Sequence, residues 1–291
     1  MQSDFGEIAA LTSVVKPNVA IITNIGISHI ESLGTRENIL RAKLEIMDGM
    51  PPDAPLVLNY DDELLCEVSS YIDRPVIYYG INKNANISAS NIEMLGTKTR
   101  FTINYYGKSI TATIPAIGKH NVYNALAAFC IGLIIDMEPR DITAAMQFYK
   151  NLGMRQNISV VDGITIIADC YNASPDSMKA AIDVISSVSC QGRRIAVLGD
   201  MLELGGVSFK AHTDVGVMVA SGHIDLLLCV GKEAKNIAIG AYAAGMKEAY
   251  QFDTKEEIIK YLKKNLHKDD AVIFKASRGA KLEEVIDAIT K

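Results

Sequence analysis

The second half of the chain alternates short apolar runs with longer segments that carry apolar residues at helical spacing. The apolar runs lie at residues 165–168, 195–198, 226–230, near 250 and at 271–274. A strand–helix repeat of this kind predicts right-handed connections and a mostly parallel sheet with helices on both faces. No G-x-G-x-x-G sequence follows the first of these strands, which counts against a dinucleotide-dependent dehydrogenase.

The first half predicts a mixed α/β domain. Residues 76–114 form short alternating runs separated by glycines, a pattern that predicts antiparallel hairpins closing one edge of this domain. A break at Asn151 divides the chain into two expected domains, residues 1–151 and 152–291. The other expected elements are strands at 19–23 and 56–59 and helices at 35–49, from Gly118, and at 141–149, with Thr35 as an N-cap.

The composition is that of a globular protein that does not bind nucleic acid. Of the 291 residues, 49% are hydrophobic and 22% are charged, which is enough to bury a core. The net charge of −5 argues against a nucleic-acid-binding domain, because such domains are strongly basic. Five cysteines without C-x-x-C spacing predict free thiols in a reducing compartment. With no signal peptide and no apolar run long enough to cross a bilayer, we expect a cytoplasmic protein without membrane insertion.

A turn after the strand at 165–168 concentrates polar residues. Asp169 stands at the carboxyl end of the strand, where open α/β sheets place side chains that contact ligands. Ser174 is expected to be the N-cap of the next helix, with Pro175 in its first position. A helix start of this kind attracts phosphate or carboxylate groups. Taken alone, the same residues are also compatible with an ordinary capped turn.

Lys43 falls on the apolar face of the helix expected at residues 35–49. A helical wheel places it within a stripe formed by Ile39, Leu40, Leu44, Ile46 and Met47. A buried, unpaired ammonium is costly, so such a lysine shifts its pKa or finds a partner. The alternative is that its stem packs on the apolar face while the charged end reaches water.

Two long motifs resemble those of a known family. Residues 168–178 read A-D-C-Y-N-A-S-P-D-S-M, and residues 198–205 read L-G-D-M-L-E-L-G. Both closely resemble the Mur ligases, specifically the MurF type, and the resemblance runs from about Phe5 to the end of the chain. It implies part of a central ATP-binding domain with a mixed sheet, followed by a Rossmann-like, mostly parallel C-terminal domain. Full-length family members begin well upstream of Met1, so a preceding part of the same enzyme is an expected partner.

The resemblance implies a metal site in the first half. Residues 24–31 and 41–43 are similar to a family motif that carries a metal-binding histidine, here His29, and a lysine that forms a carbamate, here Lys43. A carbamate supplies anionic oxygen, which suits Mg²⁺. His29 alone would be ambiguous, because a lone histidine is more often structural than a ligand. Imidazole is also an unusual ligand for Mg²⁺, so this assignment rests on the resemblance.

Other family positions imply contacts with nucleotide and dipeptide. The run from Gly118 is similar to a segment that contacts adenine, which assigns this role to Asn121 and Asn124 and, more weakly, to His120. Arg155 is similar to an arginine that reaches the nucleotide phosphates, and Asp169 is assigned to the ribose. The sequence K-A-S-R at 275–278 is similar to the family's K-G-S-R, which implies that Ser277 and Arg278 hold the carboxylate of the incoming dipeptide. Ala276 replaces the family glycine, which puts the closest backbone approach in doubt.

The implied reaction is an ATP-dependent amide-bond ligation in peptidoglycan synthesis. ATP would phosphorylate the terminal carboxylate of UDP-MurNAc-tripeptide, and D-alanyl-D-alanine would then attack the acyl phosphate. The chain has no G-x-x-G-K-[ST] phosphate loop, so we expect little or no activity from these residues alone. It is then either part of a longer enzyme or a shortened gene product. A silent nucleotide-binding or scaffold module and another amino-acid ligase of the same superfamily remain alternatives.

Overall fold

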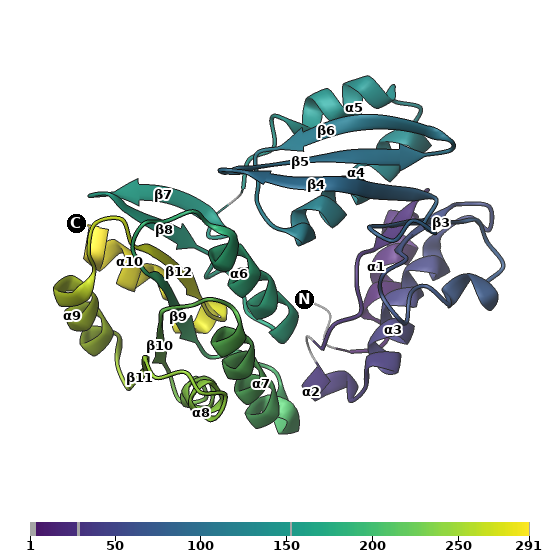
Figure 1. Cartoon of the computed structure of the whole chain (residues 1–291). Helices are drawn as coiled ribbons and strands as arrows, with labels where there is room; N and C mark the ends of the chain where they lie inside the picture. The colour runs from purple at the N-terminus through teal and green to yellow at the C-terminus, as the bar shows by residue number, and fades with distance from the viewer. Residues whose placement is uncertain (1–3, 28–29, 152, 291) are drawn as a thin grey trace. The chain divides into compact units, whose positions relative to one another are not determined.

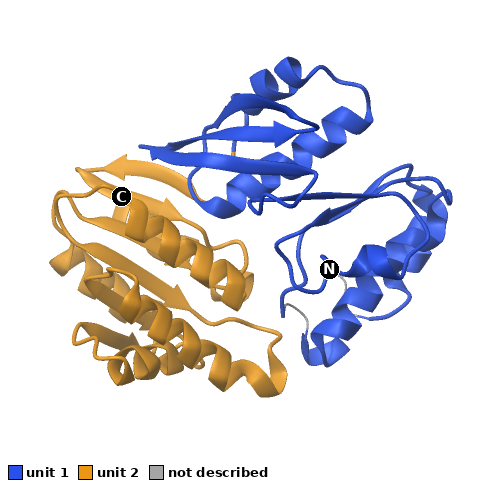
Figure 2. Cartoon of the chain, turned by 45° about the vertical axis from the view of Figure 1, so that its right-hand side comes forward, with its two compact units in different colours: residues 1–150 blue, residues 151–291 orange. Residues whose placement is uncertain are grey.

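The computed structural model describes residues 4–27, 30–151 and 153–290 of the chain. The chain divides into two compact units, residues 1–150 and 151–291 (Figure 2). Each unit contains a six-stranded sheet. Among the described residues, no helix is long and apolar enough to cross a membrane.

The sheet of the first unit has the strand order β1-β2-β3-β4-β5-β6 (Figure 1). Its first four strands pair in parallel and its last three in antiparallel fashion. The prediction of antiparallel hairpins from residue 76 onward is therefore wrong for β3, which is parallel to both neighbours. Its sequence V-I-Y-Y-G does not alternate with polar residues, as is typical of strands in a parallel sheet. The strands are β1 (Ala20–Ile22), β2 (Leu56–Asn59), β3 (Val76–Gly80), β4 (Ile87–Leu95), β5 (Lys98–Tyr105) and β6 (Lys108–Ile114).

Helix α3 (Arg36–Leu44) of the first unit begins at the cap that the sequence predicts. The Thr35 side chain accepts a hydrogen bond from the Asn38 backbone N–H, which confirms it as an N-cap. This helix ends at Leu44, earlier than predicted, and continues as a short 3-10 turn over Glu45–Gly49. The α-helices are α1 (Glu7–Val15), α2 (Ile30–Leu33), α3 (Arg36–Leu44), α4 (Lys119–Ile134) and α5 (Pro139–Met146).

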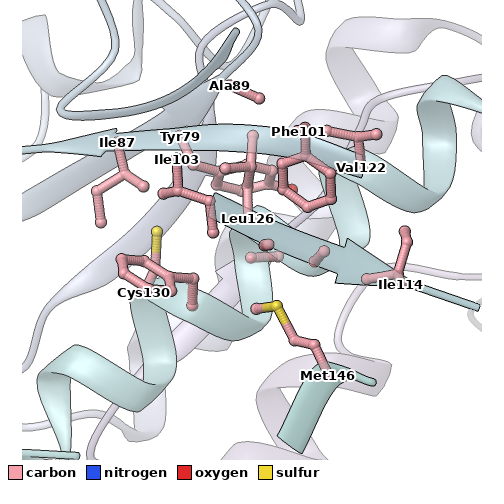
Figure 3. Packing of buried hydrophobic residues seen from close by; sticks show 14 of the residues in the cluster. Tyr79, Ile87, Ala89, Phe101, Ile103, Ile114, Val122, Leu126, Cys130 and Met146 are labelled. Carbon is pink, nitrogen blue, oxygen red and sulfur yellow. The ribbon is translucent and has the colours of Figure 1, made fainter. Parts of the chain in front are cut away.

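One core of the first unit lies between the antiparallel strands and the two helices that follow them (Figure 3). Val122 and Leu126 of α4 pack with Phe101 and Ile103 of β5. A second cluster forms where α3 covers β1 and β2. Burying an aliphatic or aromatic side chain contributes about 1.5–3 kcal/mol each, so these clusters outweigh the exposed ion pairs as sources of stability.

The sheet of the second unit has the order β11-β10-β9-β12-β8-β7. All pairs are parallel except the one between β7 and β8 at the edge. The edge strand β7 was not predicted, because its half-exposed sequence N-I-S-V-V lacks the continuous apolar character of its neighbours. The strands are β7 (Asn157–Val161), β8 (Ile164–Ala168), β9 (Arg194–Gly199), β10 (Leu226–Val230), β11 (Ala249–Phe252) and β12 (Ala271–Lys275).

Helices cover both faces of this second sheet, as predicted (Figure 1). Ile258 and Leu262 of α9, and Val285 and Ile286 of α10, join one core with the strands. Helices α6 and α7 lie against each other on the other side of the sheet. The helices are α6 (Pro175–Ser187), α7 (Ser208–Ser221), α8 (Lys235–Ala243), α9 (Lys255–Asn265) and α10 (Glu283–Thr290).

Candidate functional site

Three turns meet at one edge of the sheet in the second unit. β12 lies between β8 and β9 and is parallel to both, so the carboxyl ends of the three strands are neighbours. The turns begin at Asp169, Asp200 and Ala276. In open α/β sheets this edge is where ligands bind.

Lys275 connects the last strand to the turn that carries Asp169. Its Nζ lies 2.9 Å from Asp169 Oδ2 and donates to the backbone carbonyl of Asn172 at 3.0 Å. The lysine is only 2% exposed. The carboxylate predicted to reach a ribose is therefore paired with a buried ammonium. Sequence reasoning gave Lys275 no role, although a lysine that directly ends an apolar strand is a signal for a buried partner.

The side chains of Ser277 and Arg278 differ in burial, although the two residues are adjacent. Ser277 is buried, and its Oγ accepts a hydrogen bond from the Leu202 N–H at 3.0 Å and donates to the Ala173 carbonyl at 3.5 Å. The Arg278 side chain is 61% exposed and forms an ion pair with Glu283, with 2.6 Å between Nη1 and Oε1. Of the two residues assigned to the dipeptide carboxylate, only Arg278 has a side chain that is accessible from solvent.

The methyl group of Ala276, in the place of the family glycine, has a specific neighbour. Ala276 is completely buried. A Cβ placed on Gly199 would lie 2.7 Å from the Ala276 Cβ, so the methyl occupies the space beside that glycine on β9. The substitution is thus accommodated by the adjacent strand.

The start of α6 is capped by its own side chains, which confirms Ser174 as the N-cap and Pro175 in the first turn. The Ser177 N–H donates to Ser174 Oγ at 3.4 Å, and Ser177 Oγ accepts from the Ser174 N–H at 2.8 Å. Because proline has no N–H, Asp176 carries the one N–H of the first three helical residues that this cap leaves available. The helix start therefore has less capacity for an anion than its sequence suggested.

The turn after β9 is held by a buried histidine and an aspartate. His212 Nε2 accepts a hydrogen bond from the Met201 N–H at 3.0 Å, while its Nδ1 lies 2.8 Å from the Ser208 carbonyl. This arrangement assigns the proton of the neutral ring to Nδ1. Asp200 Oδ1 accepts from the backbone N–H groups of Glu233 and Ala234 at 3.0 and 2.7 Å. These contacts fix the turn, and neither side chain was assigned a chemical step.

Arg155 lies over an aromatic ring of the same unit. Its guanidinium carbon is 4.3 Å from the centre of the Tyr171 ring, and both side chains are exposed. Stacking of this kind restrains a guanidinium while leaving its N–H groups free to bind phosphate.

In the first unit, Lys43 is bonded to the backbone rather than extended into solvent. Its Nζ donates to the Asn24 carbonyl at 2.7 Å. Burial lowers the pKa of the amine, and the charge of Asp62 partly opposes this shift. Asp62 was missed by sequence reasoning, and it also accepts a hydrogen bond from the Ile25 N–H at 2.7 Å. A desolvated amine beside oxygen atoms suits formation of a carbamate. His29 lies outside the described residues, among which no group of three or more His, Cys, Asp or Glu forms a metal site.

Asn121 and Asn124 line a pocket of about 630 Å³ between α4, α5 and the end of β6. Asn121 is buried, and its Nδ2 donates to the Ile117 carbonyl at 2.9 Å. Asn124 is exposed, and its Oδ1 accepts no hydrogen bond from the described residues, so this amide can read the edge of a base. His120 is half-buried in the first turn of α4 and does not line the described pocket. The remaining lining is mainly apolar, including Ala128, Ile131, Met146, Phe148 and Tyr149.

Both halves of the chain match described protein families. Residues 1–132 match the Mur ligase middle domain, and residues 154–278 match the family described as Mur ligase, glutamate ligase domain.

Several curated proteins that share one name are similar to this chain over nearly its whole length. The UDP-N-acetylmuramoyl-tripeptide–D-alanyl-D-alanine ligase of Bacillus subtilis (strain 168) is 39% identical over 283 residues, which are 97% of this chain and 61% of that protein. The protein of the same name from Escherichia coli (strain K12) is 32% identical, over 98% of this chain and 62% of its own length. The chain thus spans about three fifths of these relatives.

Solved structures agree with these matches. A crystal structure of MurF from Acinetobacter baumannii superposes with a TM-score of 0.91 at 27% identity, covering 99% of this chain and 63% of that one. The MurF ligase of Thermotoga maritima in complex with ADP gives a TM-score of 0.87 at 25% identity, covering 99% of this chain and 65% of that one.

Proposed function

The chain belongs to the Mur ligase family, and we propose that it is part of an ATP-dependent ligase that joins D-alanyl-D-alanine to UDP-MurNAc-tripeptide in peptidoglycan precursor synthesis. The observation that carries this proposal is the 39% identity to a curated ligase of that name over 97% of the chain. The superposition on MurF with a TM-score of 0.91 supports it.

The proposed reaction has two steps. The terminal carboxylate of the tripeptide takes the γ-phosphoryl group of ATP, which gives an acyl phosphate and ADP. The amine of D-alanyl-D-alanine then attacks the acyl carbon, forms the amide bond, and releases inorganic phosphate and a proton. The protein contributes mainly by holding the reactants and by offsetting charge that develops on oxygen.

The second unit supplies residues that suit nucleotide and dipeptide. Asp169 is proposed to accept hydrogen bonds from the ribose hydroxyls, and Arg155 to bind the phosphates. Arg278, whose side chain is 61% exposed, is proposed to bind the dipeptide carboxylate, because a guanidinium pairs with a carboxylate through two parallel hydrogen bonds. The buried hydroxyl of Ser277 favours a supporting role beside Arg278.

The first unit supplies residues that suit adenine and a metal ion. Asn124, beside Asn121, is proposed to contact adenine at the amide end of the pocket, and His120, which does not line the pocket, is assigned to adenine more weakly. Lys43 as a carbamate and His29 would hold Mg²⁺, which supplies positive charge near the phosphates when bound. The lowered pKa of Lys43 supports this assignment, because the neutral amine is the form that adds CO₂.

These 291 residues alone are proposed to be inactive as a ligase, since they contain no G-x-x-G-K-[ST] phosphate loop. We place the parent enzyme in the cytoplasm. The five cysteines of this chain are all free thiols, as expected in a reducing compartment.

A chimeric enzyme tests the proposed function. This chain would replace the matching 61% of the Bacillus subtilis ligase, and phosphate release would be measured with ATP and UDP-MurNAc-tripeptide. We expect release to depend on D-alanyl-D-alanine and not on L-alanyl-L-alanine. Arg278→Gln should raise the KM for the dipeptide, whereas the matched exposed variant Lys247→Met should not. A folded chimera that hydrolyses ATP without response to the dipeptide would contradict the assignment.

A further inference from the structure

Lys275, the last residue of β12, and Ser277, two residues later, connect two turns of the second unit through buried hydrogen bonds. Lys275 bonds to the turn at residues 169–173, and Ser277 bonds to both that turn and the turn at residues 200–202. We propose that Lys275 and Ser277 are positioning residues, which fix these two turns so that Asp169 and Arg278 meet the ligands. This inference rests on the proposed nucleotide and dipeptide roles of those two residues.

Lys275 holds Asp169 in one orientation. The ammonium has three N–H donors, and three acceptors surround it: Asp169 Oδ2 at 2.9 Å, the Asn172 carbonyl at 3.0 Å and the Asp169 carbonyl at 3.4 Å. A buried charge of this kind is stable only with such partners. Asp169 Oδ1 makes no hydrogen bond to any described residue. Lys275 therefore occupies one oxygen of the carboxylate and leaves the other for a ligand.

The Ser277 hydroxyl has no donor to spare for the carboxylate of a dipeptide, because its single O–H is already used. Its hydroxyl accepts from the Leu202 N–H and donates to the Ala173 carbonyl, and its own N–H donates to the Asp200 carbonyl at 2.9 Å. At 3% exposure, the side chain does not reach solvent. An incoming carboxylate would have to break these internal bonds to contact it. Ser277 thus fixes the turns, and the contact with the carboxylate falls to Arg278.

Hydrogen exchange followed by mass spectrometry tests the positioning role without any ligand. In Lys275→Met, we expect amide exchange at residues 169–174 to become about tenfold faster, the equivalent of one lost hydrogen bond to a charged group. In Ser277→Ala, the increase should centre on Leu202. The exposed variant Lys247→Met should match the unsubstituted chain. Unchanged exchange in folded variants would overturn the inference.

Lys275→Met leaves Asp169 buried without its cation and can fail to fold. The double variant Lys275→Met with Asp169→Asn removes both charges, which is far less costly than removing one. We expect it to fold and to show the same faster exchange at residues 169–174. If it folds with unchanged exchange, Lys275 does not hold the turn.

Calorimetric titration of the chimeric enzyme with ADP separates this inference from the proposed function. We expect Asp169→Asn and Lys275→Met each to weaken ADP binding about tenfold, and the double variant to bind no more weakly than either. Additive losses would mean that Lys275 acts apart from Asp169 and would overturn the inference while the nucleotide site stands. If the unsubstituted chimera binds no ADP, the nucleotide role assigned to these residues fails, and the exchange experiment decides the positioning role by itself.

Discussion

At the scale of single residues, the amine of Lys43 is held against the carbonyl of Asn24, and burial lowers its pKa below the ordinary value of 10.5. At a given pH, more of this amine is neutral than at an exposed lysine. We therefore predict that the chain forms a carbamate in ¹³C-labelled bicarbonate at a pH where ordinary lysines do not. Carbon NMR would detect the signal, and Lys43→Met should remove it. A signal that survives in Lys43→Met but is lost in the exposed control Lys83→Met would contradict the prediction.

The contact between Gly199 and Ala276 gives a second prediction. Gly199→Ala would bring two methyl groups to 2.7 Å in a buried space, and overpacking of this kind costs roughly 1–3 kcal/mol. Urea denaturation should show that loss, and adding Ala276→Gly should recover most of it. Gly206→Ala is the matched control, because a methyl there meets no atom within 4 Å. Equal effects of the two glycine variants would argue against a specific contact.

Local residue patterns predicted the caps but not the long-range pairs. Thr35 and Ser174 were identified because a cap and the N–H it receives are three residues apart in sequence. Lys275 and Asp169 are 106 residues apart, so no local pattern links them. Ser277 was assigned to a ligand because the family motif gives residue types, whereas its burial depends on turns from elsewhere in the chain.

At the scale of secondary-structure elements, Asp270 links the starts of β9 and β12. Its carboxylate is 2.7 Å from the Arg193 guanidinium and accepts hydrogen bonds from the N–H groups of Arg193 and His267 at 2.8 and 3.0 Å. Burial alone would raise the pKa of this carboxyl, but these hydrogen bonds lower it below its ordinary value of 3.8. Its contribution to stability is thus present above the unfolded-state pKa and is lost as the pH falls through the lower folded-state pKa.

Asp270→Asn should accordingly lower the free energy of unfolding by roughly 1.5–3 kcal/mol at neutral pH. The difference from the unsubstituted chain should shrink as the pH falls below 3.8. Urea denaturation at several pH values measures this, with the exposed Asp183→Asn as control. A difference that does not change with pH would show that the ionised carboxylate is not the source of the stability.

Elements with a strong pattern were predicted well, and elements defined by their neighbours were not. The parallel strands β8, β9, β10 and β12 were found from their continuous apolar runs, because such strands are buried on both faces. β7 pairs with a single neighbour at a sheet edge and carries no such run. The parallel direction of β3 was missed because residues 76–114 were interpreted together as hairpins, although the sequence V-I-Y-Y-G does not alternate with polar residues.

At the scale of the whole molecule, each unit has its own sheet and its own core. We predict that residues 151–291 fold when expressed alone, because every strand of their sheet lies within that range. Circular dichroism should show one cooperative thermal transition, and Asp270→Asn should lower its midpoint as it does in the full chain. A non-cooperative transition in this shorter chain would contradict the independence of the unit.

The central position of β12 has a consequence for synthesis on the ribosome. β12 is the last strand that the structure describes, yet it joins β8 to β9. Until residues 271–275 leave the ribosome, the earlier strands of this sheet form two separate pieces with exposed edges. Such edges are prone to pair with other chains, so nascent chains are most exposed to aggregation late in translation. A stop codon shortly before residue 271 would thus remove both the centre of the sheet and the lysine that holds Asp169.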